Sequence, residues 1–193
     1  CGAQLVCYRL TLFKRLMKHM KLMYEEISAG RESFSSEYLV SWEETGRFFG
    51  DDFELDEDLT REFAREALSR ALDEKRQDEF RSKRCLTGPH LDQIRFYING
   101  MDASQFGSQG QQRSIVLAEK LAEAAVIEEV LGQKPVLLLD DVMSELDGSR
   151  REALVSYISD DVQTFITTAN LAYFDAGMLV RANVVELPMR ELV

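Results

Sequence analysis

The sequence predicts an α/β protein with parallel strands and crossover helices, preceded by a mainly helical region. Two observations in the second half carry this prediction. Residues 136–139 form an unbroken apolar stretch, which is typical of a buried strand, and strand and helix patterns alternate after it. In the first half, apolar residues instead recur at helical spacing. We therefore expect a helical arm or lobe domain over residues 1–84 and an α/β domain over residues 85–193.

The composition fits a soluble globular protein and limits the function classes. The chain has 193 residues, of which 45% are hydrophobic and 30% charged, and no apolar run is long enough to cross a bilayer. A formal net charge of -11 argues against a dedicated nucleic-acid clamp. The three cysteines lack metal-ligand spacing, so we expect free thiols. The chain begins without Met and runs directly into an amphipathic pattern, so we expect part of a longer polypeptide; a processed or engineered start is the alternative.

The opening segment is predicted to be a helix that packs along another helix and ends at Gly30. Its apolar residues alternate spacings of four and three, as in a coiled-coil seam: Val6, Leu10, Phe13, Met17, Met20, Tyr24 and Ile27. The pattern does not identify the partner helix, for which a segment upstream of Cys1 is one candidate.

The rest of the arm is predicted to hold one strand and a second helix. The strand covers residues 37–42, and a polar loop at residues 51–58 leads into the helix. One face of that helix is apolar and the remainder is densely charged; the apolar residues are Leu59, Phe63, Ala67, Leu68, Ala71 and Leu72.

The α/β domain is predicted to begin with a turn at residues 87–90 and a strand at 94–98 that enters a hairpin turn at Asn99-Gly100. A largely buried helix follows at 111–131, and then a central strand at 136–139 that we expect to be covered on both faces. A helix at 149–158, a strand at 162–167 and a weaker strand at 179–187 complete the order.

Asp140 and Asp141 follow the apolar strand at the position where α/β sheets place ligands. One carboxylate there can hold Mg²⁺, usually through water, and a neighbouring one can orient or deprotonate an attacking water. The alternative is that the acidic pair merely caps the next turn.

Ser108 and Gly110 precede the long helix, so a hydroxyl and free N–H groups converge at its electropositive N-terminus, which suits a phosphate. The alternative is a simple serine N-cap with polar glutamines.

Two further polar motifs follow. Asp147 comes shortly after the acidic pair, and it could equally be only the N-cap of the next helix. Thr167, Thr168, Ala169 and Asn170 end the next strand, where hydroxyl and amide groups can sense a γ-phosphate or cap a helix.

No G-x-x-x-x-G-K-[ST] phosphate loop occurs in the sequence. We therefore expect groups that polarise, sense and hydrolyse a nucleotide, but not the loop that holds it.

The order and spacing of these motifs resemble the C-terminal half of an ABC-type ATPase head. The residues of these motifs resemble more closely those of the RecF family, bacterial recombination mediators related to Rad50 and SMC proteins. The chain would be a C-terminal portion of such a protein, without the Walker A loop. The resemblance rests on FGSQGQQRS at 106–114, LLLDDVMSELD at 137–147 and TFITT at 164–168. It extends to the Gly-Pro-His at 88–90, followed by Asp92, and to the Ile-Asn-Gly at 98–100.

The resemblance implies that Ser108, Gly110 and Gln111 form a signature motif that contacts ATP bound to the opposite subunit. This sequence departs from the family pattern after the Gly-Pro-His: Leu91 and Gln93 stand where the family typically has an arginine and a second acid.

In the second half, the resemblance makes Asp140 the Walker B group for Mg²⁺, through water. Asp141 stands at the place of the catalytic carboxylate, Asp147 is the D-loop acid that couples the two sites of a dimer, and Thr168 lies at the sensor position. Ala169 replaces what is often a third threonine.

For the whole protein, the resemblance implies ATP-dependent homodimerisation on double-stranded or gapped DNA, where RecO and RecR are helped to load RecA. It implies roles in replication, repair and the SOS response in the bacterial cytoplasm near the nucleoid, with slow ATP hydrolysis as a release switch. This chain alone is expected to be inactive. The alternatives are a non-catalytic dimerisation or interaction module, and another SMC- or Rad50-like ATPase head.

Overall fold

The computed structural model describes residues 1–42, 48–50, 57–158 and 162–187 of the chain. The chain divides into two compact units, Cys1–Lys134 and Pro135–Val193. The boundary predicted after residue 84 lies within the first unit, because strands from both sides of that point pair in one sheet.

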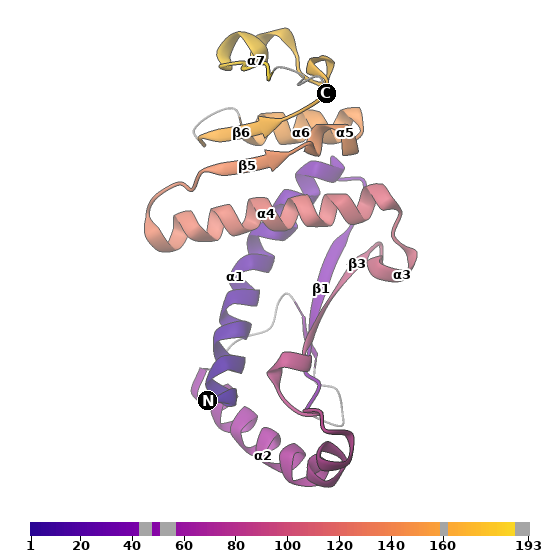
Figure 1. The fold of residues 1–193 in the computed structure, drawn as a ribbon, viewed down its shortest axis with the longest axis vertical. Coiled ribbons are helices and arrows are strands. Elements are labelled where there is room, and N and C mark those ends of the chain that lie inside the picture. The colour runs from indigo at the N-terminus through magenta and orange to yellow at the C-terminus, as the bar shows by residue number, and fades with distance from the viewer. Residues whose placement is uncertain (43–47, 51–56, 159–161, 188–193) are drawn as a thin grey trace, which may run out of the picture. The chain divides into compact units, whose positions relative to one another are not determined.

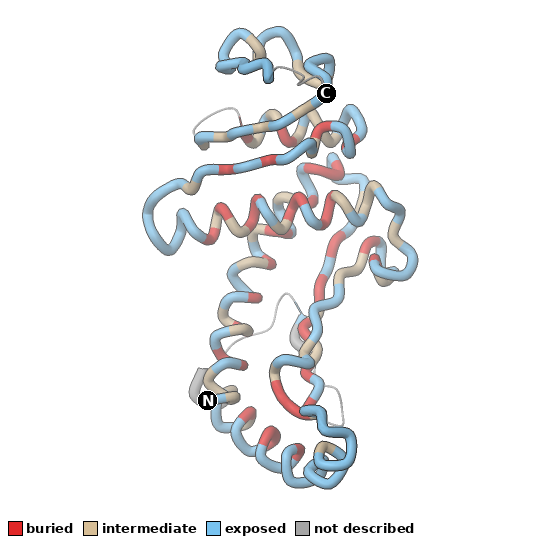
Figure 2. The backbone as a smooth tube through the Cα atoms, in the orientation of Figure 1, coloured by how far each residue is buried: buried red, intermediate tan, exposed pale blue. Residues whose placement is uncertain are grey.

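Helix α1 (Gly2–Ser28) forms the core of the first unit. All seven residues of the predicted seam are buried, and Figure 2 shows them as repeated red bands along the helix. The helix ends as predicted, with Ala29 and Gly30 in the left-handed region at φ 52° and φ 66°.

The partners of α1 lie within the chain, so the seam needs no upstream helix. The helix packs against α4 (Gln109–Leu131) and α2 (Glu57–Ser82), and Figure 1 shows α4 crossing it. At the crossing, His19 Nε2 lies 2.9 Å from Glu129 Oε2, and hydrogen bonding to His19 lowers the pKa of the Glu129 carboxyl. The sequence pattern identified the buried stripe but not the two helices that cover it.

A four-stranded antiparallel sheet completes the first unit, in the order β2-β1-β3-β4. Its strands are β1 (Phe34–Leu39), β2 (Phe48–Gly50), β3 (Gln93–Ile98) and β4 (Met101–Asp102). The β3–β4 turn is the predicted one: Asn99 and Gly100 both have positive φ, as a two-residue type I′ turn requires.

Strand β1 lies at residues 34–39 and not at the predicted 37–42. The Asp92 carboxylate explains where it stops, because it accepts hydrogen bonds from Ser41 N at 3.0 Å and from the Tyr38 hydroxyl at 2.9 Å. This carboxylate satisfies the Ser41 amide in place of a ladder partner. Burial, followed by the Asp92 charge, raises the pKa of Tyr38 to about 12.

Helix α2 buries much of the predicted apolar face. Ala64, Ala67, Leu68 and Ala71 are buried, whereas Leu72 is 47% exposed. The small alanines let α2 lie close to α1, and the covered stripe is therefore narrower than the pattern suggested. The loop predicted at 51–58 lies mostly outside the described residues.

In the second unit, β5 (Leu137–Asp140) and β6 (Thr164–Thr167) pair in parallel, with α5 (Val142–Glu145) and α6 (Gly148–Ile158) between them in sequence. The parallel crossover was predicted, but the covering of β5 on both faces is wrong. Leu137 and Leu139 are buried, whereas Leu138 is 73% exposed. The strand therefore alternates between a covered and an open face.

The strand predicted at 179–187 is also wrong. Asp175 accepts a hydrogen bond from Met178 N at 2.9 Å and so caps a short helix, α7 (Ala176–Arg181), and residues 182–187 form no strand. Three short helical turns complete the structure: η1 (Pro89–Leu91), α3 (Ala103–Phe106) and η2 (Leu171–Tyr173). No helix among the described residues is both long and apolar enough to traverse a membrane.

Candidate functional site

Asp140 ends β5 and Asp141 follows it, and Thr167 lies beside them at the carboxyl end of β6. Asp140 is paired in register with Thr167, whose hydroxyl donates to Asp140 Oδ1. The same hydroxyl accepts from Asp141 N at 3.0 Å. One threonine side chain therefore ties both aspartates to the neighbouring strand.

The two carboxylates point to different neighbours. Asp141 has φ 48° and ψ 25°, a left-handed conformation that Asp tolerates better than most residues, and this turns the chain from β5 into α5. Its Oδ2 accepts from the Ser144 hydroxyl at 2.9 Å. Asp140 faces Thr167 and Asp141 faces Ser144, so the pair can serve two separate roles.

The donors at this edge fit a magnesium ion bound largely through water. Both aspartates are exposed, and a Thr hydroxyl stands beside Asp140. Mg²⁺ typically keeps several waters and takes one or two carboxylates together with phosphate oxygens. No cluster of three or more His, Cys, Asp or Glu side chains that could enclose a metal occurs among the described residues. Asp140 is thus suited to hold Mg²⁺ only together with water and a phosphate.

Asp147 is the N-terminal cap of α6, the alternative that the sequence left open. Its Oδ1 accepts from Arg150 N at 3.0 Å and its Oδ2 from Arg150 Nη1 at 2.6 Å. Nearby, Arg151 donates to Met143 O at 2.8 Å and lies 4.2 Å from the centre of the Tyr173 ring. These contacts hold the turn that follows the acidic pair.

Thr168 has local contacts, and Thr167 is the residue that reaches the acidic pair. The Thr168 hydroxyl accepts from Asn170 N and donates to Asn170 O, both at 3.2 Å. The resemblance assigned the sensor position to Thr168, but the strand register places Thr167 opposite Asp140.

Ser108 and Gln111 form a reciprocal capping box at the start of α4. Ser108 Oγ accepts from Gln111 N at 3.2 Å, and Gln111 Oε1 accepts from Ser108 N at 2.8 Å. The serine N-cap is therefore present. Just before it, a Cβ on Gly107 would stand 2.4 Å from Ala103 O, so only glycine fits this approach.

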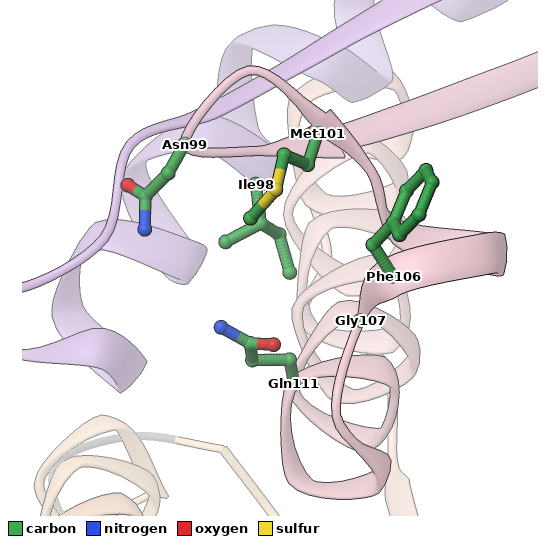
Figure 3. A pocket seen from close by; sticks show the side chains of 6 residues that line it. All are labelled: Ile98, Asn99, Met101, Phe106, Gly107 and Gln111. Carbon is green, nitrogen blue, oxygen red and sulfur yellow. The ribbon is translucent and has the colours of Figure 1, made fainter.

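Gln111 also contacts the connection between α1 and β1. Its Nε2 donates to Glu32 Oε1 at 2.9 Å. Figure 3 shows Gln111 below the β3–β4 hairpin, beside a small hollow lined by Ile98, Asn99, Met101, Phe106, Gly107 and Gln111. Gly110 lies within the first turn, and its carbonyl accepts from the buried Ser114 hydroxyl at 2.8 Å.

The predicted site residues thus fall into two groups. Ser108, Gly110 and Gln111 belong to the first unit, and Asp140, Asp141, Asp147 and Thr168 to the second. Each group is held in place by the contacts within its own unit that are described above.

Comparison with known proteins relates the chain to RecF. The DNA replication and repair protein RecF of Pediococcus pentosaceus is 40% identical over 171 residues, which is 89% of this chain and 43% of that protein. RecF of Rippkaea orientalis is 38% identical over 188 residues, which covers 96% of this chain and 46% of that protein. No family model matches the sequence.

Solved structures of RecF are also similar to this chain. A structure of the recombination mediator protein RecF with ATPrS, in the RecFOR pathway, has a TM-score of 0.68 and 31% identity, covering 88% of this chain and 42% of that one. A structure of RecF with ATP has a TM-score of 0.65 and 32% identity, covering the same shares. The chain spans less than half the length of these relatives.

The expected fold, a portion of an ABC-type head with a parallel sheet beside a helical region, is confirmed by this likeness. In sequence and in fold, the chain corresponds to a portion of a RecF protein, as its motifs indicated.

Proposed function

We propose that this chain is the signature and Walker B portion of an ATP-dependent DNA-binding protein of the RecF type. The observation that carries the proposal is the acidic pair at the carboxyl ends of β5 and β6, tied to Thr167. In open α/β sheets, this edge is where ligands bind. The RecF structures that the chain resembles hold ATP or ATPrS.

In this proposal Asp140 holds Mg²⁺ through water, and the ion neutralises phosphate charge when it is bound. Asp141 orients the attacking water and accepts its proton. The Ser144 hydroxyl donates to Asp141 Oδ2, which fixes the carboxylate and leaves Oδ1 to face the water.

The start of α4 acts on ATP held by a second copy of the protein. Ser108, Gly110 and Gln111 lie at the N-terminus of a 23-residue helix, where N–H groups and the helix dipole attract a phosphate. Ser108 Oγ uses a lone pair in the capping box, and its proton can be donated to a γ-phosphate oxygen. Across the dimer, Asp147 couples the two sites and Thr168 senses the γ-phosphate.

The complete protein would dimerise on ATP and hold double-stranded or gapped DNA. There it would assist RecO and RecR in loading RecA, in replication, repair and the SOS response, in the cytoplasm near the nucleoid. Slow ATP hydrolysis would release the DNA.

The chain alone lacks a phosphate loop in its sequence, so it would bind Mg-ATP weakly and hydrolyse none. Calorimetry that shows micromolar one-to-one binding of Mg-ATP to this chain would contradict the proposal that the rest of the nucleotide site lies outside it.

The decisive test uses the complete protein and a gapped DNA duplex, with fluorescence anisotropy in the presence of Mg-ATP. Asp140→Asn should weaken ATP-dependent DNA binding by about tenfold or more, because the neutral amide is a poor Mg²⁺ ligand. Asp73→Asn, an exposed change on α2, is the matched control and should leave binding unchanged. Equal affinities for the parental protein and Asp140→Asn would refute the proposed nucleotide site.

A further inference from the structure

A chain of hydrogen bonds connects the start of α4 to the buried core of the first unit. Tyr24, in the last turns of α1, is fully buried, and its ring stacks on Phe34 with centroids 4.9 Å apart. Its hydroxyl donates to Glu32 Oε2 at 2.6 Å. Glu32 Oε1 then accepts from Gln111 Nε2, and Gln111 Oε1 accepts from Ser108 N.

Glu32 is chemically suited to the middle of this chain because both of its neighbours donate. A Tyr hydroxyl and a Gln amide NH₂ require two acceptor atoms, which one carboxylate supplies. Hydrogen bonds to a charged acceptor are also stronger than neutral ones. Glu32 lies in the short connection between α1 and β1, so its backbone is held at both ends by regular structure.

Glu32 also determines which way the Gln111 amide faces. With Nε2 directed to the carboxylate, Oε1 must face Ser108 N, and the capping box can form. If the amide were turned over, its NH₂ would confront the Ser108 N–H, donor against donor. The orientation of the residues that cap α4 therefore depends on a residue more than seventy positions away in the sequence.

We infer that Glu32, anchored by Tyr24, is a positioning residue that fixes Gln111 and Ser108 in the orientation in which they meet the nucleotide. This inference rests on the proposed function of the signature end. It adds residues from the α1–β1 connection to a site that the motif alone confines to residues 108–111. Glu32 acts through Gln111 and touches no nucleotide itself.

The test compares three variants of the complete protein. Glu32→Ala removes both acceptors. Glu32→Gln keeps an oxygen for Gln111 and can donate its NH₂ to the Tyr24 hydroxyl oxygen, so it preserves the chain. Glu26→Ala is the matched control, an exposed glutamate of α1 whose side chain makes no contact that the structure records.

Two measurements are made on each variant. Hydrogen exchange followed by mass spectrometry reports on a peptide spanning residues 107–112, with residues 115–126 of the same helix as the internal reference. Light scattering in the presence of a non-hydrolysable ATP analogue reports the protein concentration at which dimerisation is half-maximal.

Glu32→Ala should raise exchange in peptide 107–112 about tenfold, with residues 115–126 unchanged, because a hydrogen-bonded constraint on the cap is lost. It should also weaken ATP-dependent dimerisation, while Glu32→Gln and Glu26→Ala stay near the parental values in both measurements. Parental exchange in Glu32→Ala, or faster exchange in both segments, would overturn the inference. Faster exchange confined to 107–112 with parental dimerisation would support the positioning role and refute the proposed contact with nucleotide across the dimer.

Discussion

The two groups of candidate residues are held in place in different ways. At the start of α4, hydrogen bonds lead from Ser108 through Gln111 and Glu32 to a fully buried tyrosine. At the ends of β5 and β6, the contacts of Asp140 and Asp141 join side chains that are themselves exposed. The first group is itself exposed or half-buried but is linked to a buried side chain, whereas the side-chain partners of the acidic pair are exposed.

The same contrast appears in the packing of the two units. The α1 seam is covered along its whole length, whereas the β5–β6 sheet leaves Leu138 and Phe165 exposed. Both groups can be reached by ligands from solvent, and the start of α4 is also held by hydrogen bonds that lead to a buried side chain. This division suits an acidic group that meets water and a signature group that must match a partner.

The largest expected effect concerns the acidic pair at the end of β5. Asp141→Asn in the complete protein should lower ATP turnover by about 100-fold or more, because the proton acceptor is lost. ATP affinity should stay unchanged, since Asn is nearly isosteric and tolerates the left-handed backbone at φ 48°. Steady-state turnover and equilibrium nucleotide binding, measured side by side, check this. Turnover at the parental rate would show that Asp141 is not the catalytic acid.

The next effect concerns the start of α4. Ser108→Arg should weaken ATP-dependent dimerisation by roughly 30-fold or more, because a bulky cation is placed where the partner's phosphate would meet α4. ATP binding to the monomer should be retained. Ser108→Ala is the comparison variant: it removes the cap, at about 1 kcal/mol, and the hydroxyl's contact with phosphate, but adds no bulk, so it should weaken dimerisation less than Ser108→Arg. Sedimentation with an ATP analogue measures the association; loss of nucleotide binding together with dimerisation would indicate misfolding instead.

A third prediction compares the two faces of β5 in this chain. Leu137→Ala should lower the free energy of unfolding by about 2–5 kcal/mol, because it leaves a cavity on the covered face. Leu138→Ala, one residue along and 73% exposed, should change it by less than about 0.5 kcal/mol. Urea unfolding of both variants gives the comparison. Equal costs would mean that the outer face of β5 is covered in solution.

The smallest effect concerns pH and the first unit. Because the folded-state pKa of Tyr38 is raised from 10.0 to about 12, its contribution to stability is complete below pH 10 and is lost as the pH rises through 12. Tyr38→Phe should cost about 1–2 kcal/mol at neutral pH and reduce the alkaline loss of stability. Unfolding measured from pH 8 to pH 11 tests this; equal alkaline slopes in both proteins would contradict it.

Much of the fold could be read from the sequence because local patterns determine it. The heptad spacing located every buried residue of the α1 seam, and Asn99-Gly100 located the hairpin. The sequence failed where contacts between distant segments decide. The Asp92 carboxylate ends β1 early, and α4 supplies the partner of α1, neither of which a local pattern reveals.

In the candidate site, too, the sequence did not predict contacts between distant segments. The acidic pair and the Ser108 cap follow from motifs, but Thr167 required the strand register and Glu32 required the folded α1–β1 connection. The strand predicted at 179–187 failed because Asp175 caps a short helix there, which the apolar residues alone did not indicate.

The central claim is that the signature end of one copy serves the acidic pair of another. Mixing complete proteins carrying Ser108→Arg and Asp141→Asn tests it most directly, with ATP turnover as the readout. Each variant alone should be nearly inactive. In a mixed dimer, however, the acidic pair of the Ser108→Arg copy meets the intact Ser108 of the other. At protein concentrations high enough for the Ser108→Arg copy to dimerise, about half the dimers of an equimolar mixture are mixed and each holds one intact site, so the mixture should recover roughly a quarter of the parental rate. No recovery, with both variants still binding ATP, would contradict a site shared between two copies.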